Sequence, residues 1–381
     1  MTLKHSRLNI AELSDVHLGH NKTSASHIVK NLYRAFPDNE ITGELDIIWI
    51  AGDLFDSLLN LPSESVSEIT KWATHFLKLC KKRDIVLRVL EGTPSHDWQQ
   101  AKLLVDINEH ADIGADLNYI QELSIEYIER FGIHILYVPD EWRPKNSHTW
   151  HEVQVLLLSH QLSKVDFCIM HGCFTYQIPP SLLDMFETHD TENYIGITEY
   201  LIFIGHIHQH SQYKNILSAG SFDRLSHGEE EPKGHIRATV NKDGTYTAKF
   251  IVNEGAKTYL TLDYSGLSLD EVYRRLDELI PTIKDDSHVR IQASTEDAVF
   301  KAGSEIKARY KNIHLRFKSN ERKVKHEPIV QKDIVKPINL TNGTILQLLS
   351  TSLQENHPKI ADNAKQYLSE LLEEYDKSST S

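Results

Sequence analysis

Short apolar runs in the first 210 residues lead into polar loops that carry aspartate or histidine. The run Leu8–Leu13 is followed by S-D-V-H-L-G, and the run Asp46–Ala51 leads into Gly52 and Asp53. Later runs lead in the same way into G-T-P-S-H-D, M-H-G and G-H-I-H. In open α/β sheets, ligand sites form outside the carboxyl ends of the strands. The pattern therefore predicts a layered α/β domain with a polar site along one edge.

Apolar residues at helical spacing separate several of these runs. Helices are predicted over Ser24–Phe36, with Ser24 or Ser26 as the cap, and over Ser63–Lys82. Past Gly205 the sequence becomes rich in β patterns. The further predicted strands are Ile85–Leu90, Ile133–Val138, Val165–Met170, Tyr200–Ile204, Ile216–Gly220, His235–Asn241, Thr245–Val252 and Tyr259–Leu262.

A smaller αβ unit follows, and a polar segment separates it from a helical tail. The predicted boundaries are 1–257 for the main domain, 258–318 for the small unit, 319–340 for the linker and 341–377 for the tail. The elements predicted in the small unit are the helices Leu269–Ile280 and Glu296–Tyr310 and the strands Val289–Ala293 and Ile313–Phe317.

The composition limits the classes of protein to which this chain can belong. A net charge of −13 and a pI of about 5.9 argue against a protein that coats nucleic acid, because such proteins are basic. Three cysteines without a C-x-x-C pair indicate structural thiols in a reducing compartment. No signal peptide and no run of roughly 20 apolar residues is present, so we expect a cytoplasmic protein outside the membrane.

The polar loops carry the ligand types of a centre for two metal ions. Asp15 and His17 lie two residues apart, as do His206 and His208, so each pair can reach one ion. Asp53 has two oxygens and could bridge two ions about 3.5–4 Å apart. Imidazole and carboxylate without thiolate suit manganese, iron or zinc better than calcium. Two metals held in this way are a standard device for cleaving phosphate esters.

The residue types also predict how such a centre would work. A hydroxide between the ions would attack phosphorus, and His96 could protonate the leaving oxygen, because imidazole exchanges protons near neutral pH. Asp97 would orient the His96 ring. Other histidines are expected on the surface or on helices: His20, His27, His75, His110 and His210.

The order D-x-H, G-D, H-D, H-G, G-H-x-H resembles the calcineurin-like metallophosphoesterase superfamily. More narrowly, the chain resembles the SbcD nuclease family, relatives of the eukaryotic meiotic-recombination-eleven nuclease. S-D-V-H-L-G and A-G-D-L-F-D match the first two motifs of that family, and Ser218–His235 resembles its later signature. The resemblance covers residues 8–255, and it implies a β-sandwich flanked by helices with a small αβ capping domain and a helical tail.

That resemblance also implies an activity and partners. It implies a Mn²⁺-dependent DNA nuclease, with Mg²⁺ as a second possibility, that acts as a double-strand exonuclease and single-strand endonuclease in recombination, repair and replication. The partners would be DNA, an SbcC-like ATPase of the structural-maintenance type that docks on the tail, and a second copy of the chain.

The family's motifs assign a role to individual residues. Asp15, His17 and His208 would hold the first ion, His171 and His206 the second, and Asp53 would bridge them. The remaining residues to which the resemblance gives a role are His96, as the acid; Asp56, which would position the substrate or His96; and Arg224, which would be structural or contact the DNA backbone.

One motif departs from the family pattern. The family has G-N-H-D, in which the Asn oxygen is a ligand of the second metal, whereas this chain has G-T-P-S-H-D with Ser95 before His96. A hydroxyl is a shorter and poorer ligand than an amide oxygen. The sequence therefore predicts a weak second metal site, which calorimetry showing two equally tight sites would contradict.

Other interpretations remain open from sequence. The chain could be a phosphatase or small-molecule phosphodiesterase on the same fold, or a DNA-end-binding subunit that has lost catalysis. The apolar stripe of Ser63–Lys82 could form a homodimer interface or pack on its own sheet, because periodicity does not separate the two. The apolar residues of Thr344–Leu353 could dock on a partner or on this chain.

Overall fold

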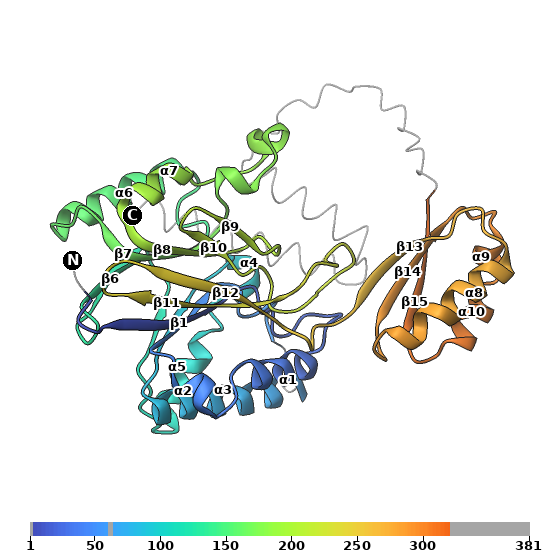
Figure 1. Ribbon diagram of the computed structural model, residues 1–381, viewed down its shortest axis with the longest axis horizontal. Coiled ribbons are helices and arrows are strands. Elements are labelled where there is room, and N and C mark those ends of the chain that lie inside the picture. The colour runs from blue at the N-terminus through green and yellow to red at the C-terminus, as the bar shows by residue number, and fades with distance from the viewer. Residues whose placement is uncertain (1–2, 60–63, 321–381) are drawn as a thin grey trace, which may run out of the picture. The chain divides into compact units, whose positions relative to one another are not determined.

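Two six-stranded mixed sheets pack face to face, and helices cover their outer surfaces (Figure 1). The computed structural model describes residues 3–59 and 64–320, all within one unit of the chain. The first sheet runs β12 (Tyr246–Val252), β11 (Gly234–Asn241), β1 (Arg7–Leu13), β2 (Ile47–Ala51), β3 (Val86–Leu90) and β4 (Leu117–Ile120). The second runs β5 (Ser124–Ile128), β6 (Ile133–Val138), β7 (Val165–His171), β8 (Thr198–Gly205), β10 (Ile216–Ser218) and β9 (Ser211–Tyr213).

The centre of each sheet is parallel, and the antiparallel strands lie towards the edges. β1 to β4 run parallel to one another, as do β6, β7, β8 and β10. Every residue of β2 and β7 is buried, so these strands read as continuous apolar runs rather than alternating ones. This arrangement confirms the predicted α/β layering, and the predicted ligands lie at the carboxyl ends of the five parallel strands β1, β2, β3, β7 and β8.

Aromatic side chains fill the space between the sheets. The Trp49 ring on β2 lies 5.3 Å from that of Phe167 on β7 and 5.4 Å from that of Phe203 on β8, measured between centroids. All three rings are fully buried. Aromatic pairs at such distances add to the stabilisation from apolar burial, so these contacts fix the two sheets, and with them the two halves of the site, against each other.

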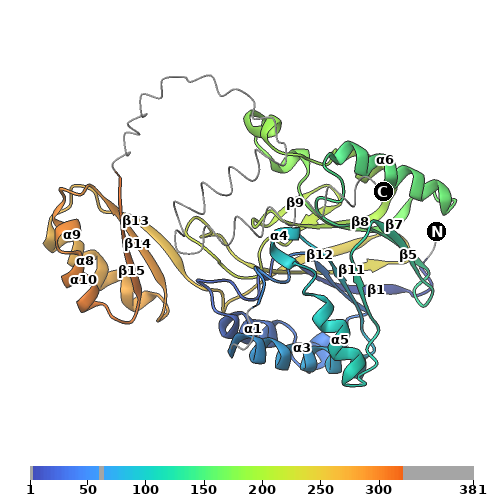
Figure 2. The ribbon, with the colours of Figure 1, turned by 180° about the vertical axis from the view of Figure 1, so that it is seen from behind.

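Helices α1 (Ala25–Ala35), α3 (Glu64–Arg83) and α5 (Lys102–His110) cover the first sheet (Figure 2). Ser24 caps α1, as predicted, by accepting a hydrogen bond from the His27 amide. On α3 the Trp72 and Phe76 rings stack and are buried in the core of the chain itself. The described part of the Ser63–Lys82 apolar stripe therefore packs on its own sheet, which is one of the two predicted alternatives.

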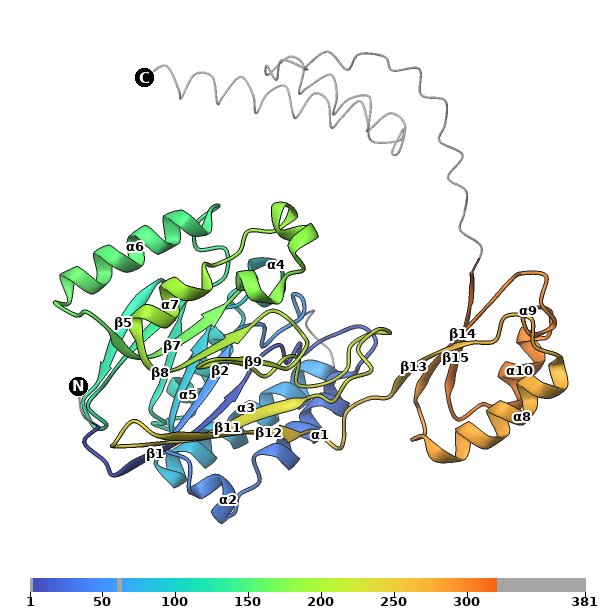
Figure 3. The ribbon, with the colours of Figure 1, turned by 45° about the horizontal axis from the view of Figure 1, so that its top comes forward.

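The sequence patterns did not predict several of the helices and strands. α6 (Asn146–Ser159) and α7 (Thr191–Ile197) cover the outer face of β7 and β8, as Figure 3 shows. The strands β4, β5 and β9 and the helices α2 (Glu40–Gly43) and α5 were also not predicted. All three cysteines are buried and unpaired, in agreement with structural thiols. In the ranges the structure describes, no helix has both the length and the apolar character needed to cross a membrane.

The small unit has its own sheet and its own core. Parallel strands β13 (Tyr259–Asp263), β14 (His288–Ala293) and β15 (His314–Ser319) are covered on one face by α8 (Leu269–Leu279), α9 (Ala298–Lys301) and α10 (Gly303–Arg309) (Figure 3). The prediction of one helix over Glu296–Tyr310 is wrong. The helix breaks at Ala302, and Gly303, a poor helix former, packs against the Phe317 ring. The structure continues β15 through Ser319, and the rest of the predicted linker beyond Asn320, with the whole tail, lies outside the described residues.

A buried histidine makes the stability of the fold depend on pH. His235 on β11 packs on the Phe36 ring and accepts a hydrogen bond from Arg237 Nε at 3.2 Å. Burial and the Arg237 charge lower the pKa of His235 from 6.5 to about 3. The folded chain binds a proton at His235 more weakly than the unfolded chain does. The stability that depends on neutral His235 is therefore fully present above pH 6.5 and is lost as the pH falls below that value. Between pH 7 and pH 4 we expect this residue to reduce the free energy of unfolding by on the order of 3 kcal/mol.

Urea unfolding of wild type and His235→Gln at both pH values measures this effect. Glutamine does not titrate, so the variant should lose less stability on acidification than wild type does. Equal losses in the two proteins would contradict the assignment to His235.

Candidate metal centre

The loops after the central strands bring the predicted ligands into one cluster. Three groups of side chains have ligand atoms within 4.8 Å of one another: Asp15, His17 and His208; His17, Asp53 and His96; and Asp53, His171 and His206. The backbone is unusual there, because φ is 49° at Asp15, 54° at His17, 49° at Asp53 and 96° at His206. Left-handed conformations at residues other than glycine cost free energy and gather at functional sites.

Two glycines allow these loops to approach one another. Gly52 has φ of 85°, and a Cβ there would lie 2.2 Å from Nδ1 of His171. A Cβ on Gly92 would lie 2.1 Å from the Asp53 amide nitrogen. Any side chain at either position would push the loops apart, so both glycines are needed to bring His171 and Asp53 together.

The first group of ligands forms around Nε2 of two histidines. His17 Nε2 lies 3.2 Å from His208 Nε2 and 3.8 Å from Asp53 Oδ2, and His208 Nε2 lies 3.8 Å from Asp15 Oδ1. The opposite ring nitrogens face carboxylates, since His17 Nδ1 lies 3.3 Å from Asp56 and His208 Nδ1 lies 3.4 Å from Glu229. Carboxylates at Nδ1 orient a histidine so that Nε2 is free to bind metal.

The second group forms around the other oxygen of Asp53. His171 Nε2 lies 3.4 Å from Asp53 Oδ1, and His171 Nδ1 lies 2.7 Å from the Ala51 carbonyl oxygen, which fixes the ring. His206 Nδ1 lies 3.4 Å from Oδ2 of Asp140, a residue that the motifs did not predict. Asp53 therefore lies between the two groups, with Oδ1 near His171 and Oδ2 near both His17 and Thr93.

The electrostatics of the cluster favour bound cations. Burial opposes ionisation of Asp53, but His171 and His17 lower its pKa well below the usual range. Burial likewise opposes protonation of His171, yet Asp53 raises its pKa well above the usual value. Across residues 3–59 and 64–320, no lysine or arginine forms an ion pair with Asp15, Asp53 or Asp140. Buried carboxylates without a basic partner are costly unless a metal balances their charge.

His96 lies at the open side of the cluster. Its side chain is 39% exposed, and Nδ1 lies 3.5 Å from Asp53 Oδ2 and 3.4 Å from His17 Nδ1. Asp97 does not orient the ring, contrary to the prediction. Its carboxylate instead accepts hydrogen bonds at 2.8 Å from the amides of Phe55 and Gly92, and thereby ties two ligand loops together. Burial, with the nearby Asp53 charge, raises the pKa of Asp97 to about 7.

Ser95 is not brought to the cluster. Its side chain is exposed, and besides His96 the residue from this motif that reaches the ligands is Thr93. The reason is the short helix α4 (Pro94–Asp97), where a turn was expected: Pro94 begins the helix, and Thr93 is its cap residue. The expectation of a weak second site rested on Ser95 and loses that basis.

The two other predicted residues have definite contacts. Asp56 contacts His17 rather than His96, as described above. Arg224 donates hydrogen bonds to the backbone carbonyls of Glu231, Lys257 and Glu230, so it shapes its own loop. Two roles were predicted for Arg224, a structural one and contact with the DNA backbone. These contacts support the structural role.

Sequence reasoning missed Thr93, Asp140 and Glu229. Asp140 follows the predicted strand Ile133–Val138 directly after Pro139, so the rule that found the other ligands applies to it as well. Glu229 lies in the signature segment Ser218–His235, where only its acidic character was noted. Its oxygens face His208, the Leu225 amide and Lys233.

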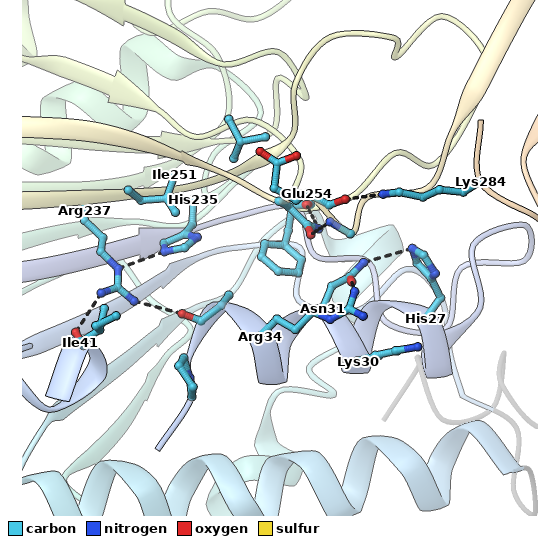
Figure 4. Close-up of a pocket in the computed structure, with 16 residues that line it drawn as sticks. His27, Lys30, Asn31, Arg34, Ile41, His235, Arg237, Ile251, Glu254 and Lys284 are labelled. Carbon is cyan, nitrogen blue, oxygen red and sulfur yellow. Dashed lines mark hydrogen bonds between the residues drawn. The ribbon is translucent and has the colours of Figure 1, made fainter. Parts of the chain in front are cut away.

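A large cavity of about 840 Å³ lies elsewhere, between α1 and the strands β11 and β12 (Figure 4). Its lining includes the basic residues Lys30, Arg34 and Lys284 and apolar residues such as Phe222 and Ile251. None of the metal-ligand candidates borders it. The metal chemistry is therefore separate from this cavity.

Comparison with known proteins identifies no relative from which an activity can be transferred. No family model matches the chain, and no curated protein matches its sequence. The solved structure of TT1561 from Thermus thermophilus is 10% identical with a TM-score of 0.36, and the match covers 64% of this chain and 98% of TT1561. GAP50, the anchor in the inner membrane complex of Plasmodium, is 11% identical with a TM-score of 0.40, covering 66% of this chain and 86% of GAP50. At these values neither neighbour indicates an activity, and what the chain does has to follow from its own residues.

Proposed function

We propose that this chain is a metal-dependent phosphodiesterase of the metallophosphoesterase fold that cleaves DNA with Mn²⁺. The observation that carries the proposal is that Asp53 lies between two ligand groups. Its Oδ2 is 3.8 Å from His17, which groups with Asp15 and His208, and its Oδ1 is 3.4 Å from His171, which groups with His206. Imidazole and carboxylate donors without thiolate suit manganese, iron or zinc, and the family resemblance favours Mn²⁺ among these, with Mg²⁺ as a second possibility. Two such ions, when bound, activate a water molecule and neutralise charge on the phosphate.

The protein's own residues hold and orient the ligands. Asp56 and Glu229 face the outer nitrogens of His17 and His208, and the Ala51 carbonyl oxygen does the same for His171. Asp97 fixes the distance between the loops of Asp53 and Gly92 through two backbone amides. A constellation held in this way needs little reorganisation when a phosphodiester binds.

His96 is the residue placed to donate a proton to the leaving oxygen. It is among the more exposed of the clustered histidines, and its Nδ1 lies 3.5 Å from Asp53 Oδ2. It groups with His17 and Asp53, not with Asp15 and His208 or with His171 and His206. An imidazole at the open side of the site can reach a substrate oxygen, whereas the fully buried His171 cannot.

DNA as the substrate is supported by the resemblance of Ser218–His235 to the SbcD signature and by the small sheet. Arg290 and Arg316 lie side by side in register on β14 and β15. Val289, Ile291 and Leu315 alternate with them and face the core, so both arginines lie on the face opposite α8 to α10. Neither arginine pairs with a carboxylate among the described residues, which leaves both free for phosphates.

The SbcC-like ATPase, the homodimer and the cytoplasmic location are part of the same proposal. The ATPase would supply positive charge that this acidic chain lacks. The activity would be a double-strand exonuclease and single-strand endonuclease in repair and recombination.

Replacing His96 by alanine should reduce DNA cleavage about 10²- to 10⁴-fold, because that is the usual contribution of a general acid. Binding of Mn²⁺ should remain. The assay is degradation of linear double-stranded and circular single-stranded DNA with Mn²⁺, by the chain alone and with its ATPase partner and ATP. His75→Ala, on the exposed side of α3, is the control and should cleave like wild type.

Undiminished cleavage by His96→Ala would remove that residue from the mechanism. Turnover of mononucleotides or phosphoproteins without cleavage of DNA would favour a phosphatase. Binding of DNA ends without any Mn²⁺-dependent cleavage would favour a subunit that has lost catalysis.

A further inference from the structure

Asp140 is a half-buried carboxylate at the edge of the metal centre, and among the described residues it forms no ion pair with a lysine or an arginine. It follows β6 after Pro139, and its side chain is only 12% exposed. Oδ1 accepts a hydrogen bond from the amide of Glu141 at 2.9 Å. Oδ2 points the other way, 3.0 Å from Thr93 Oγ1 and 3.4 Å from His206 Nδ1. A charge buried in this manner needs a cation to balance it.

The Thr93 hydroxyl lies close to four ligand atoms at once. Its Oγ1 is 3.0 Å from Asp140 Oδ2, 3.3 Å from Asp53 Oδ2, 3.4 Å from His206 Nδ1 and 3.5 Å from His171 Nε2. A hydroxyl has a single proton and can donate only one hydrogen bond, so hydrogen bonding alone does not account for four neighbours.

An octahedral ion accounts for this arrangement. When metal–ligand bonds are about 2.1 Å long, each ligand lies about 3 Å from four of the others. Thr93 Oγ1 has that relation to two carboxylates and two imidazoles. The sixth ligand position is left for water or substrate.

We infer that Asp140 and Thr93 are ligands of the second metal ion, with Asp53, His171 and His206. This inference rests on the proposed two-metal centre and adds the residues that complete its second half. Thr93 alone is a poor ligand, but Asp140 brings a full negative charge to the same ion.

The two halves of the centre then have matching charge. The first site has Asp15, the shared Asp53 and two histidines, and the second has Asp140, Asp53 and two histidines with the Thr93 hydroxyl. With equal numbers of carboxylates and imidazoles, the two sites should bind Mn²⁺ with affinities within about tenfold of each other. A weak second site is not expected.

Titration calorimetry with Mn²⁺ on the full chain tests the inference, and electron paramagnetic resonance counts the bound ions. Wild type should bind two ions per chain. Asp140→Asn should bind Mn²⁺ at the first site with wild-type affinity. Its affinity for Mn²⁺ at the second site should fall about 10- to 100-fold. Glu141→Gln is the matched control, because that carboxylate belongs to the same loop but is exposed, and it should bind like wild type.

A second variant separates ligation from a structural role. Adding Thr93→Asn to Asp140→Asn supplies an amide oxygen where the hydroxyl stands, and it should recover part of the second site's affinity. A loss caused only by damage to the loop would not be recovered. Circular dichroism checks that each variant folds.

The outcomes distinguish this inference from the function it rests on. Two ions in Asp140→Asn with wild-type affinities would overturn the role of Asp140 and leave the two-metal centre standing. One tight and one weak ion in wild type would also overturn it. Failure of wild type to bind Mn²⁺ at all would overturn both the inference and the proposed function.

Discussion

Asp53→Asn should bind at most one Mn²⁺ tightly and should cleave DNA at least about a thousand-fold more slowly than wild type. Asp53 has one oxygen 3.4 Å from His171 and the other 3.8 Å from His17, so it faces both ligand groups. Asparagine has the same shape but has one oxygen and no charge, so it cannot serve both ions. Losing the charge stabilisation of one ion costs several kcal/mol in the transition state, and each 1.4 kcal/mol is about tenfold in rate.

Single-turnover cleavage of linear DNA and Mn²⁺ titration measure the two effects of Asp53→Asn. Asp243→Asn, in the exposed turn between β11 and β12, is the control and should leave both unchanged. Rapid cleavage by Asp53→Asn, together with two bound ions, would mean that this carboxylate does not bridge the metals.

Asp97→Ala should lower the free energy of unfolding by about 3 kcal/mol and lower Mn²⁺ affinity as well. The carboxylate is fully buried and accepts hydrogen bonds from the amides of Phe55 and Gly92. Alanine leaves both buried amides without a partner, and each such loss costs about 1–3 kcal/mol. The loops of Asp53 and Thr93 would then lose the link that sets their distance.

Urea unfolding at neutral pH measures the loss of stability, and calorimetry measures the affinity for Mn²⁺. Asp97→Asn keeps one acceptor oxygen and should lose less stability than Asp97→Ala. Asp106→Ala on α5 removes an exposed carboxylate and should change stability by less than about 1 kcal/mol. If Asp97→Ala were as stable as this control, Asp97 would not be a structural link.

The alternation of apolar runs and polar loops was enough to predict most of the site. Asp15, Asp53, His171 and His206 each follow a central strand, and strand ends converge whatever the details of packing. The same rule applied to Asp140, but a Pro-Asp pair after a strand reads equally well as an ordinary turn. Only the distance from Asp140 to His206 in the folded chain separates the two readings.

The motif G-T-P-S-H-D shows why spacing along the chain can give a wrong prediction of the ligand. Counting back from His96 gives Ser95, but Pro94 opens a helical turn that carries Ser95 outwards. A proline at the first position of a helix was a sign that the residue before it, Thr93, caps the turn and lies nearest the preceding strand. The role of Asp97 depended on two backbone amides, and no sequence pattern reports which amide lacks a partner.

The prediction of a single helix in the small unit failed for a different reason. The apolar positions Val299, Ile306 and Tyr310 are all buried as one helix would bury them, yet the chain forms two short helices. The break falls at Ala302, next to Gly303, which is a poor helix former and lies beside the ring of Phe317.

The left-handed backbone at Asp15, His17, Asp53 and His206 has a consequence for how this protein can change over time. Each such conformation costs about 1 kcal/mol or more, which glycine would relieve. A lineage selected only for folding stability would therefore lose these side chains. Its members would be more stable but would lack ligands of the proposed metal centre. Keeping all four side chains therefore costs stability, and the proposed metal centre supplies a reason for that cost.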